Sequence, residues 1–377
     1  MIMKILFWIL LLLILHTYLF YPLVLVIVGM VRGKRVKRAD ATPLVTLIIP
    51  AYNEEKVISR KIENSLELDY PKDKLEIIIA SDGSTDKTND IVREFAVKGV
   101  TLFAFEERKG KPSLYYRSVP KANGGIIVFS DADAILTKNA VKNIVKNFND
   151  ERIGCVEGVR IDSDPQGIPL ESIYWKYETF IKKQAAKLFS SLGATGALFA
   201  IRKELYFPIS ETRGDDFEIP VRVLISGHGV TTDTESIAYH PWLPNEDEFK
   251  RIARIVAFML PSAGFLLAEA LKKHRFFVVF QLISHKFLRW FVPVLLILLF
   301  LANMGLWDGF YRNFLGIQTL FYFMALCGLF FEKKHLKVVT IFKIPYYFCL
   351  INLASLVGIF RFIFGKAAVN WEKTKRG

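Results

Sequence analysis

The chain has 377 residues, 52% of them hydrophobic, and a formal net charge of +13 at pH 7. So much apolar sequence is unusual for a soluble enzyme, and the three scattered cysteines indicate neither a disulfide framework nor a zinc site. The basic residues gather beside apolar segments, which indicates contact with anionic membrane lipid and excludes nucleic acid as the expected partner.

The N-terminal segment predicts a membrane anchor. Residues 6–31 are nearly all apolar, long enough to cross about 30 Å of hydrocarbon at about 1.5 Å per residue. No small-residue cleavage site follows, as it would in a signal peptide. The basic run RGKRVKR (32–38) indicates that the cytoplasm lies on its side. We expect an integral protein of the cell membrane, with a transmembrane anchor at 1–31 and a basic juxtamembrane linker at 32–43.

Strand and helix patterns alternate after the linker. Apolar, β-branched runs predict strands at 44–50 (LVTLIIP), 74–84 (KLEIIIASDGS), 100–106 (VTLFAFE) and 124–133 (GGIIVFSDAD). Helical patterns lie at 54–68, 84–96 and 137–148, the last with Thr137 as its expected cap. This order predicts an α/β domain over residues 44–244, with a mostly parallel sheet and ligands bound at the carboxyl ends of its strands.

Three of the predicted strands end in polar or acidic turns: PAYNEE (50–55), ASDGSTD (80–86) and SDAD (130–133). Taken singly, Asn53 and Asp82 are ordinary turn and cap residues. Asp131 and Asp133 either cap the next helix or hold a divalent cation. Three acidic turns that meet at one sheet edge need a compensating cation. A nucleoside diphosphate would add more negative charge, so we expect Mg²⁺ or Mn²⁺ there.

The stretches IIPAYNEE, IIIASDGSTD, GK and FSDAD, in this order and spacing, resemble family 2 glycosyltransferases with the GT-A fold. This family includes cellulose and hyaluronan synthases and dolichyl-phosphate mannose synthase. The resemblance covers about residues 44–254, and the apolar flanks are similar to the membrane-bound branch. It implies a Rossmann-like GT-A domain with flanking transmembrane helices, and a donor that is a UDP- or GDP-sugar bound with a divalent metal.

The resemblance also implies a set of donor-binding residues. They are Pro50, Tyr52, Asn53, Glu54, Asp82, Lys109, Lys111, Asp131, Arg251 and Arg254. Those of the first turn would line the nucleotide base and ribose, and Asp82 would hydrogen-bond the base. Lys109 and Lys111 either lie near the phosphates or form a solvated basic turn. Asp131 and Asp133 match the family's Asp-x-Asp metal motif, in which the second aspartate is the main ligand.

Residues 212–227 (TRGDDFEIPVRVLISG) stand where the family carries an acidic pair at the start of a helix. The resemblance makes Asp216 the general base that deprotonates the acceptor, with Asp215 as its neighbour. Helix capping is the alternative for one of the two. The stretch GATGALF (193–199) is either the floor of the acceptor site or a packed strand.

Residues 251–255 (RIARI) stand where the family has Gln-x-x-Arg-Trp. Arg254 keeps the motif's arginine, whereas Arg251 replaces the glutamine and Ile255 the tryptophan. The missing tryptophan weakens the case for a processive synthase, because in the family it helps to cradle the acceptor. Arg251 and Arg254 either hold the leaving diphosphate or face solvent or lipid.

The C-terminal part is apolar again. We expect interfacial amphipathic helices at 245–285, broken at Pro261, and a transmembrane bundle at 286–365 built from 287–303, 315–331 and 338–364. If all three blocks cross, the basic tail (366–377) lies outside, although its charges favour the inside. We therefore expect the last block, interrupted by Pro345, not to cross fully.

The expected function is a membrane-bound inverting glycosyltransferase, with a cytoplasmic catalytic domain and a lipid-linked or membrane-proximal acceptor. A processive polysaccharide synthase of the same family and a non-catalytic membrane assembly protein are the alternatives. The presence of Asp82, Asp131, Asp133 and Asp216 together favours an enzyme. A sugar nucleotidyltransferase fits poorly, because the chain lacks an early glycine-rich phosphate loop.

Overall fold

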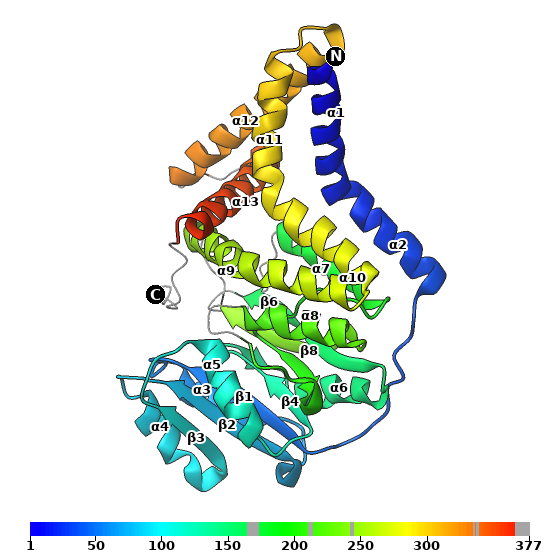
Figure 1. Ribbon diagram of the computed structural model, residues 1–377. Helices are drawn as coiled ribbons and strands as arrows, with labels where there is room; N and C mark the ends of the chain where they lie inside the picture. Colours follow the sequence, from blue (N-terminus) through cyan, green and yellow to red (C-terminus); the bar gives the residue numbers. More distant parts are fainter. Residues whose placement is uncertain (164–172, 210–213, 242–244, 335, 337–338, 366–377) are drawn as a thin grey trace. The chain divides into compact units, whose positions relative to one another are not determined.

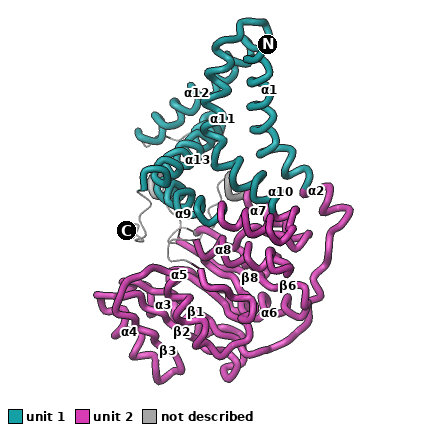
Figure 2. The backbone as a smooth tube through the Cα atoms, viewed as in Figure 1, with its two compact units in different colours: residues 1–24, 243–263, 279–367 teal, residues 25–242, 264–278, 368–377 magenta. Residues whose placement is uncertain are grey.

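A computed structural model describes residues 1–163, 173–209, 214–241, 245–334, 336 and 339–365 (Figure 1). The chain divides into two compact units (Figure 2). We call residues 1–24, 243–263 and 279–367 the helical unit, and residues 25–242, 264–278 and 368–377 the sheet unit. The predicted basic tail, 366–377, lies outside the described residues.

The sheet unit is built on one sheet that has eight strands among the described residues, in the order β3-β2-β1-β4-β7-β6-β8-β5. The strands are β1 (Val45–Ala51), β2 (Leu75–Asp82), β3 (Val100–Phe105), β4 (Ile126–Phe129), β5 (Ile135–Leu136), β6 (Ile153–Ser163), β7 (Phe199–Arg202) and β8 (Gly229–Pro241). The first four pair in parallel, as predicted. The second half is mixed, because β7 is antiparallel to both β4 and β6, whereas β6 and β8 are parallel. The sheet as a whole is therefore less parallel than the sequence predicted.

The parallel half forms because its strands are apolar on both faces. Every residue of β1 is buried, which is typical of a central parallel strand covered by helices on both sides. Its helices are α3 (Ile58–Leu66), α4 (Thr88–Glu94), α5 (Lys111–Ser118) and α6 (Ala140–Lys146). On α3, Ile58 and Ile62 pack into the core with Leu47 and Ile49 of β1. The three strands that precede the acidic turns therefore end at one edge of the sheet.

Two helix starts differ from what the sequence suggested. The predicted cap Thr137 does not cap α6: its hydroxyl donates to the carbonyl of Ile237 in β8, and Asn139 precedes the helix. At α8 (Asp215–Ser226) the N-cap residue is Gly214, so both aspartates lie inside the first turn. Neither aspartate is therefore the cap, although both lie at the positive end of the helix dipole.

The helical unit begins with α1 (Ile2–Leu15), η1 (His16–Phe20) and the start of α2 (Tyr21–Arg32). Together these helices form one continuous segment, Ile2–Arg32, at the position of the predicted anchor. The unit continues with α9 (Asn245–Lys272), α10 (Phe276–Gln281), η7 (Leu282–Phe287), α11 (Leu288–Met304), α12 (Gly309–Lys333) and α13 (Thr340–Ile363). Residues 264–278, which include parts of α9 and α10, are assigned to the sheet unit. Within the helical unit, Phe7 and Leu10 of α1 pack against Leu299 and Ala302 of α11.

Among the described residues, five helices are long and apolar enough to cross a membrane. Three of them, Phe276–Met304, Gly309–Lys333 and Thr340–Ile363, cover the predicted late blocks, and Glu248–Lys272 is an additional one. The expected proline breaks are wrong: α9 continues through Pro261 and α13 through Pro345. A proline removes one backbone hydrogen bond, which neighbouring turns of a long apolar helix can tolerate. Residues 245–272 thus form a single helix that is long enough to span.

Candidate active site

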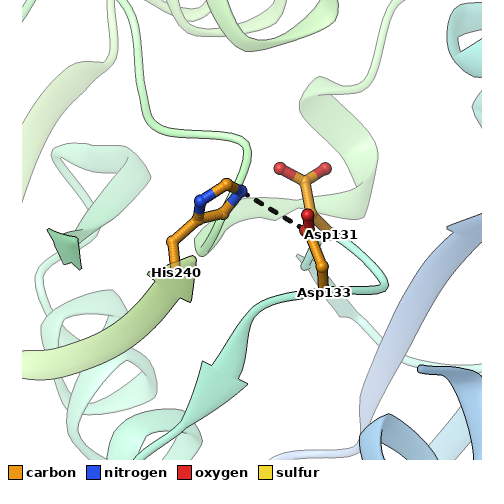
Figure 3. Close-up of side chains that lie close together, drawn as sticks. All are labelled: Asp131, Asp133 and His240. Atoms are coloured by element: carbon orange, nitrogen blue, oxygen red, sulfur yellow. Dashed lines mark ion pairs between the residues drawn. The ribbon is translucent and has the colours of Figure 1, made fainter. Parts of the chain in front are cut away.

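The turn after β4 carries Asp131 and Asp133, and the end of β8 brings His240 to them. Figure 3 shows the imidazole directed at the carboxylate of Asp133, with the carboxylate of Asp131 beside it. His240 Nε2 lies 3.3 Å from Asp133 Oδ1, and one donor atom from each of the three residues lies within 4.8 Å of the others. The strand register explains this meeting, because Ile135 and Leu136 of β5 pair antiparallel with Tyr239 and Ala238 of β8.

The hydrogen bonds of His240 suit a metal ligand. Its Nδ1 lies 2.9 Å from the carbonyl oxygen of Pro241, which can only accept, so Nδ1 is the donor. In the neutral ring this leaves the Nε2 lone pair directed to Asp133. Two carboxylates and an imidazole fit Mn²⁺ or Mg²⁺. The sequence reasoning missed His240; its place at the end of a strand, one residue before a proline, was the available signal.

Lys111, at the start of α5, joins this turn to α8. Its Nζ lies 2.8 Å from Asp131 Oδ1 and 3.2 Å from Asp215 Oδ2. Gly196 leaves room for the contact, because a Cβ there would lie 2.8 Å from Asp131 Oδ2 and 3.0 Å from Lys111 Nζ. The GATGALF stretch therefore packs closely against the charged cluster at Gly196, which has no side chain. Only its last residue, Phe199, belongs to β7.

The cluster holds more negative than positive charge. Burial alone would lower the pKa of Lys111, but the carboxylates of Asp131 and Asp215 raise it well above its usual value. Burial raises the pKa of Asp215 to about 6, and the charges of Asp216 and Asp131 add to this effect while Lys111 opposes it. Lys111 is thus held mainly by Asp131, and Asp215 is a surplus carboxylate. A divalent cation in the cluster would compensate that surplus.

A second lysine, Lys61, which the sequence analysis did not single out, lies under the turn that carries Asp131 and Asp133, which we call the metal turn. Lys61 of α3 is fully buried, and its Nζ donates to Ser130 Oγ (2.7 Å) and to the carbonyl oxygen of Ala134 (2.6 Å). These acceptors stand on either side of the two aspartates, so one side chain fixes both ends of the turn. Burial lowers the pKa of Lys61 to about 7, although Asp131 and Asp133 oppose that shift. Its position on the apolar face of a helix was the signal in the sequence.

The two aspartates of α8 differ in exposure. Asp215 is buried against Lys111, whereas Asp216 is half-buried. The backbone carbonyl of Asp216 accepts a hydrogen bond from the amide of Ala194 (2.6 Å), which ties the first turn of α8 to the GATGALF stretch. Of the pair, Asp216 is therefore the one that a second substrate can reach more easily. The two residues before Gly214 in the predicted motif lie outside the described residues.

The predicted donor residue Asp82 shapes the loop that carries the lysines. Its buried carboxylate accepts hydrogen bonds from the amides of Lys109 (3.0 Å) and Gly110 (2.7 Å), and Arg117 lies 3.3 Å away. Gly110 adopts a φ of +86°, which a residue with a side chain rarely takes. Asp82 therefore holds the loop that leads into Lys111.

The first acidic turn packs against the second. Asn53 adopts a φ of +53°, and its side-chain oxygen accepts from the amide of Thr85 (2.7 Å), while the amide of Glu54 donates to Thr88 Oγ1 (2.7 Å). The ring of Tyr52 lies under the guanidinium of Arg108 at 3.8 Å. Such a flat aromatic and cationic surface is suited to stacking a nucleobase.

The remaining predicted donor residues include Lys109 and Arg251, each of which pairs with a glutamate that is not part of the cluster around Lys111. Pro50 is buried in β1, and Lys109 Nζ pairs with Glu107 at 2.7 Å. Arg251 and Arg254 belong to α9 in the helical unit, where Arg251 lies 3.3 Å from Glu248. The sheet unit by itself therefore brings together the two aspartates of the metal turn, Lys111 and the aspartate pair of α8, together with His240, which the sequence did not single out.

The chain is similar in sequence to known glycosyltransferases. Residues 46–207 match the model of the family described as Glycosyl transferase family 2. "Probable glycosyltransferase YdaM" of Bacillus subtilis (strain 168) is 28% identical over 370 residues, covering 89% of this chain and 87% of that protein. A Methanococcus voltae protein, "Dolichyl N-acetyl-alpha-D-glucosaminyl phosphate 3-beta-D-2,3-diacetamido-2,3-dideoxy-beta-D-glucuronosyltransferase", is 32% identical over 108 residues, covering 28% of this chain and 33% of that one.

Among solved structures, a mannosyltransferase from Pyrobaculum calidifontis, PcManGT, in complex with GDP-Man and Mn²⁺, has the same fold. Its TM-score is 0.72 with 20% sequence identity, and the match covers 96% of this chain and 99% of that chain. The predicted GT-A fold with flanking apolar helices is thereby confirmed.

Proposed function

We propose, from the match of residues 46–207 to glycosyltransferase family 2, that the chain moves one sugar from a nucleoside-diphosphate sugar to a lipid-linked acceptor at the membrane. The observation that carries the proposal is the cluster in which Lys111 joins Asp131 of the metal turn to Asp215, the neighbour of Asp216. In this proposal, the cluster supplies the groups that meet the donor phosphates and, beside them, the group that accepts the acceptor proton.

On the donor side, we propose that the nucleobase stacks in the region of Tyr52 and Arg108, beside the turn that holds Asn53 and Glu54. Asp82 would orient the loop of Lys109 and Gly110 as well as meet the base. The structure of the mannosyltransferase PcManGT, solved with GDP-Man and Mn²⁺, supports a nucleotide donor that is bound together with a metal.

We propose that Asp131, Asp133 and His240 hold a divalent cation, with Asp133 as the main ligand. When bound, such a cation would neutralise the negative charge that develops on the leaving diphosphate. Lys111 supplies a further positive charge at the same point, since its raised pKa keeps it protonated. Lys111 would therefore stabilise the leaving group electrostatically, together with a cation held by Asp131, Asp133 and His240.

On the acceptor side, Asp216 would accept the proton of the acceptor hydroxyl as its oxygen attacks the anomeric carbon. The new carbon–oxygen bond forms as the bond to the diphosphate oxygen breaks, and the nucleoside diphosphate leaves with that electron pair. A single displacement of this kind inverts the anomeric configuration. Asp215 lies 3.2 Å from Lys111 Nζ and would help Asp131 to orient this lysine between the two substrates.

A lipid acceptor is supported by the membrane helices and by the relative named after a dolichyl phosphate substrate. We propose that the sheet unit faces the cytoplasm, because the run Arg32–Arg38 directly follows the first apolar helix.

The test uses the full-length protein in detergent with Mn²⁺, radiolabelled UDP- and GDP-sugars and extracted membrane lipid. We expect label in the organic phase on a product that is one sugar longer than its acceptor. Asp133→Asn should abolish the transfer, whereas Asp69→Asn, at an exposed carboxylate paired with Lys142, should not. Activity in excess EDTA would contradict the metal site. A ladder of long products would instead make the protein a processive synthase.

A further inference from the structure

The sheet unit contains a second pocket, at the far end of α8 from the aspartates. Its volume is about 260 Å³, and four of its lining residues, Lys34, Arg152, His228 and Arg275, are basic. Phe189, Phe277 and Leu188 supply apolar walls. A volume below the roughly 300–1,000 Å³ of pockets for drug-sized ligands suits a small charged group rather than a whole lipid or nucleotide.

Two of the cations are arranged around the buried ring of Phe189. Lys34 Nζ lies 5.7 Å from the ring centroid, and the Arg152 guanidinium carbon lies 5.1 Å from it. Arg152 is held by two hydrogen bonds to Asp150, of 2.8 and 2.6 Å, and the backbone amide of Lys34 donates to Lys187 at 2.8 Å. The positive groups are thus held by the fold.

Arg275 completes the pocket at the C-terminus of α8. Its Nε donates to the carbonyl of Ile225 (3.1 Å), and its Nη2 occupies the space that a side chain at Gly227 would fill, 2.6 Å from the position of such a Cβ. Gly227 has a φ of +105°, so it both ends the helix and admits the guanidinium. Asp150 offsets Arg152, which leaves a net positive pocket with Lys34 and Arg275.

The chain itself places this pocket beside the bilayer. Lys34 follows the candidate span Ile2–Arg32 by two residues, and Arg275 directly precedes the candidate span Phe276–Met304. Three extended residues reach at most about 11 Å, so both cations stay close to the ends of membrane helices. Anionic headgroups lie at that depth and attract basic residues.

We propose that this pocket binds the phosphate of an anionic phospholipid headgroup. Lys34 and Arg275 contact the phosphate, Arg152 adds charge, and Phe277 meets the glycerol and the start of the acyl chains. The pocket is distinct from the transfer site, because the twelve residues of α8 extend about 18 Å between them. Its lipid would anchor the sheet unit at the membrane surface and is not the acceptor.

The test titrates the full-length protein in detergent with palmitoyl-oleoyl phosphatidylglycerol or phosphatidylcholine and counts bound lipids by native mass spectrometry. We expect one phosphatidylglycerol to bind in preference to phosphatidylcholine. Lys34→Gln and Arg275→Gln should each weaken its binding about fivefold. Lys273→Gln is the matched control, because this exposed lysine lies two residues from Arg275 and outside the pocket, 3.7 Å from Glu269.

If Lys273→Gln weakens phosphatidylglycerol binding as much as the pocket variants do, the lipid is attracted by the overall positive charge of the surface, and the proposal is overturned. Equal binding of the two lipids would also overturn it. Displacement of phosphatidylglycerol by 10 mM inorganic phosphate would assign the pocket to a soluble phosphate instead. Should Arg275→Gln melt at a lower temperature because α8 loses its terminal hydrogen bond, Lys34→Gln decides the result alone.

Discussion

Lys111 Nζ lies 3.2 Å from Asp215 Oδ2, which ties the start of α5 to the first turn of α8. The same nitrogen lies 2.8 Å from Asp131, so a single lysine links the metal turn to the helix of the proposed base. Because the ion pairs are largely shielded from water, a displacement of Lys111 would disturb both halves of the site.

His240 is expected to set the metal affinity. His240→Ala removes an imidazole that lies 3.3 Å from Asp133, and the Mn²⁺ concentration for half-maximal activity should rise at least tenfold. Isothermal titration of Mn²⁺ should show the same loss without any donor present. His274→Ala, which changes an exposed histidine between α9 and α10, is the control. Unchanged Mn²⁺ affinity in His240→Ala would remove His240 from the site.

Lys61 is expected to hold the metal turn in shape. Lys61→Met keeps the length of the buried side chain but deletes the hydrogen bonds to Ser130 and Ala134. The turn should loosen, and Mn²⁺ affinity should fall about tenfold while the protein stays folded. The comparison is Lys142→Met, which removes an exposed lysine paired with a surface carboxylate. If both variants bind Mn²⁺ as the native protein does, Lys61 has no positioning role.

Asp216→Asn should bind donor and Mn²⁺ normally but transfer sugar about 10²–10⁴-fold more slowly, since a neutral amide cannot accept the proton. Donor binding is measured by equilibrium dialysis of labelled nucleotide sugar, and transfer by product formation. Asp215→Asn is the variant to compare, because the loss of the Asp215 charge should also disturb the position of Lys111. A failure of Asp216→Asn to bind nucleotide would place Asp216 on the donor side.

Gly196→Ala tests whether the charged cluster needs the close approach that a residue without a side chain allows. The added methyl would lie 2.8 Å from Asp131 Oδ2 and 3.0 Å from Lys111 Nζ. Both atoms are side-chain ends, so the fold should accommodate it while the ion pair shifts. A displacement of about 1 Å in such a site lowers activity by about 10²-fold. Gly125→Ala, whose added methyl meets nothing within 4 Å, should leave activity unchanged. Normal activity in Gly196→Ala would mean that the cluster tolerates movement.

Asp215 should make the metal-free protein less stable as the pH rises. Burial raises its pKa from 3.8 to about 6 in the folded state. Its contribution to stability is therefore complete below about pH 4 and is lost as the pH rises through about 6. Asp215→Asn should melt higher than the native protein at pH 7.5 and at a similar temperature at pH 4, as followed by differential scanning fluorimetry in EDTA. Parallel melting curves across this range would contradict the shift.

The sequence by itself determined those features that depend on neighbouring residues. The apolar run at Val45–Ala51 predicts a buried strand, and the polar turns that follow β1, β2 and β4 predict a site at the ends of parallel strands. The pairing of Asp131 with Asp133 is visible because one residue separates them. The apolar anchor and late helices follow from length and composition. Each is a local pattern, and local patterns determine secondary structure and membrane insertion.

Only the tertiary structure brought His240 and Lys61 to the metal turn. His240 lies more than a hundred residues after Asp133, and it arrives because β8 pairs with β5 in a register set by core packing. In the sequence, Lys61 is a polar residue within the apolar stripe of an amphipathic helix. In the structure, α3 buries its side chain, and its Nζ donates to Ser130. The antiparallel insertion of β7 was likewise decided by long-range pairing. Contacts of this kind depend on which apolar faces pack together, and no short stretch of sequence contains that information.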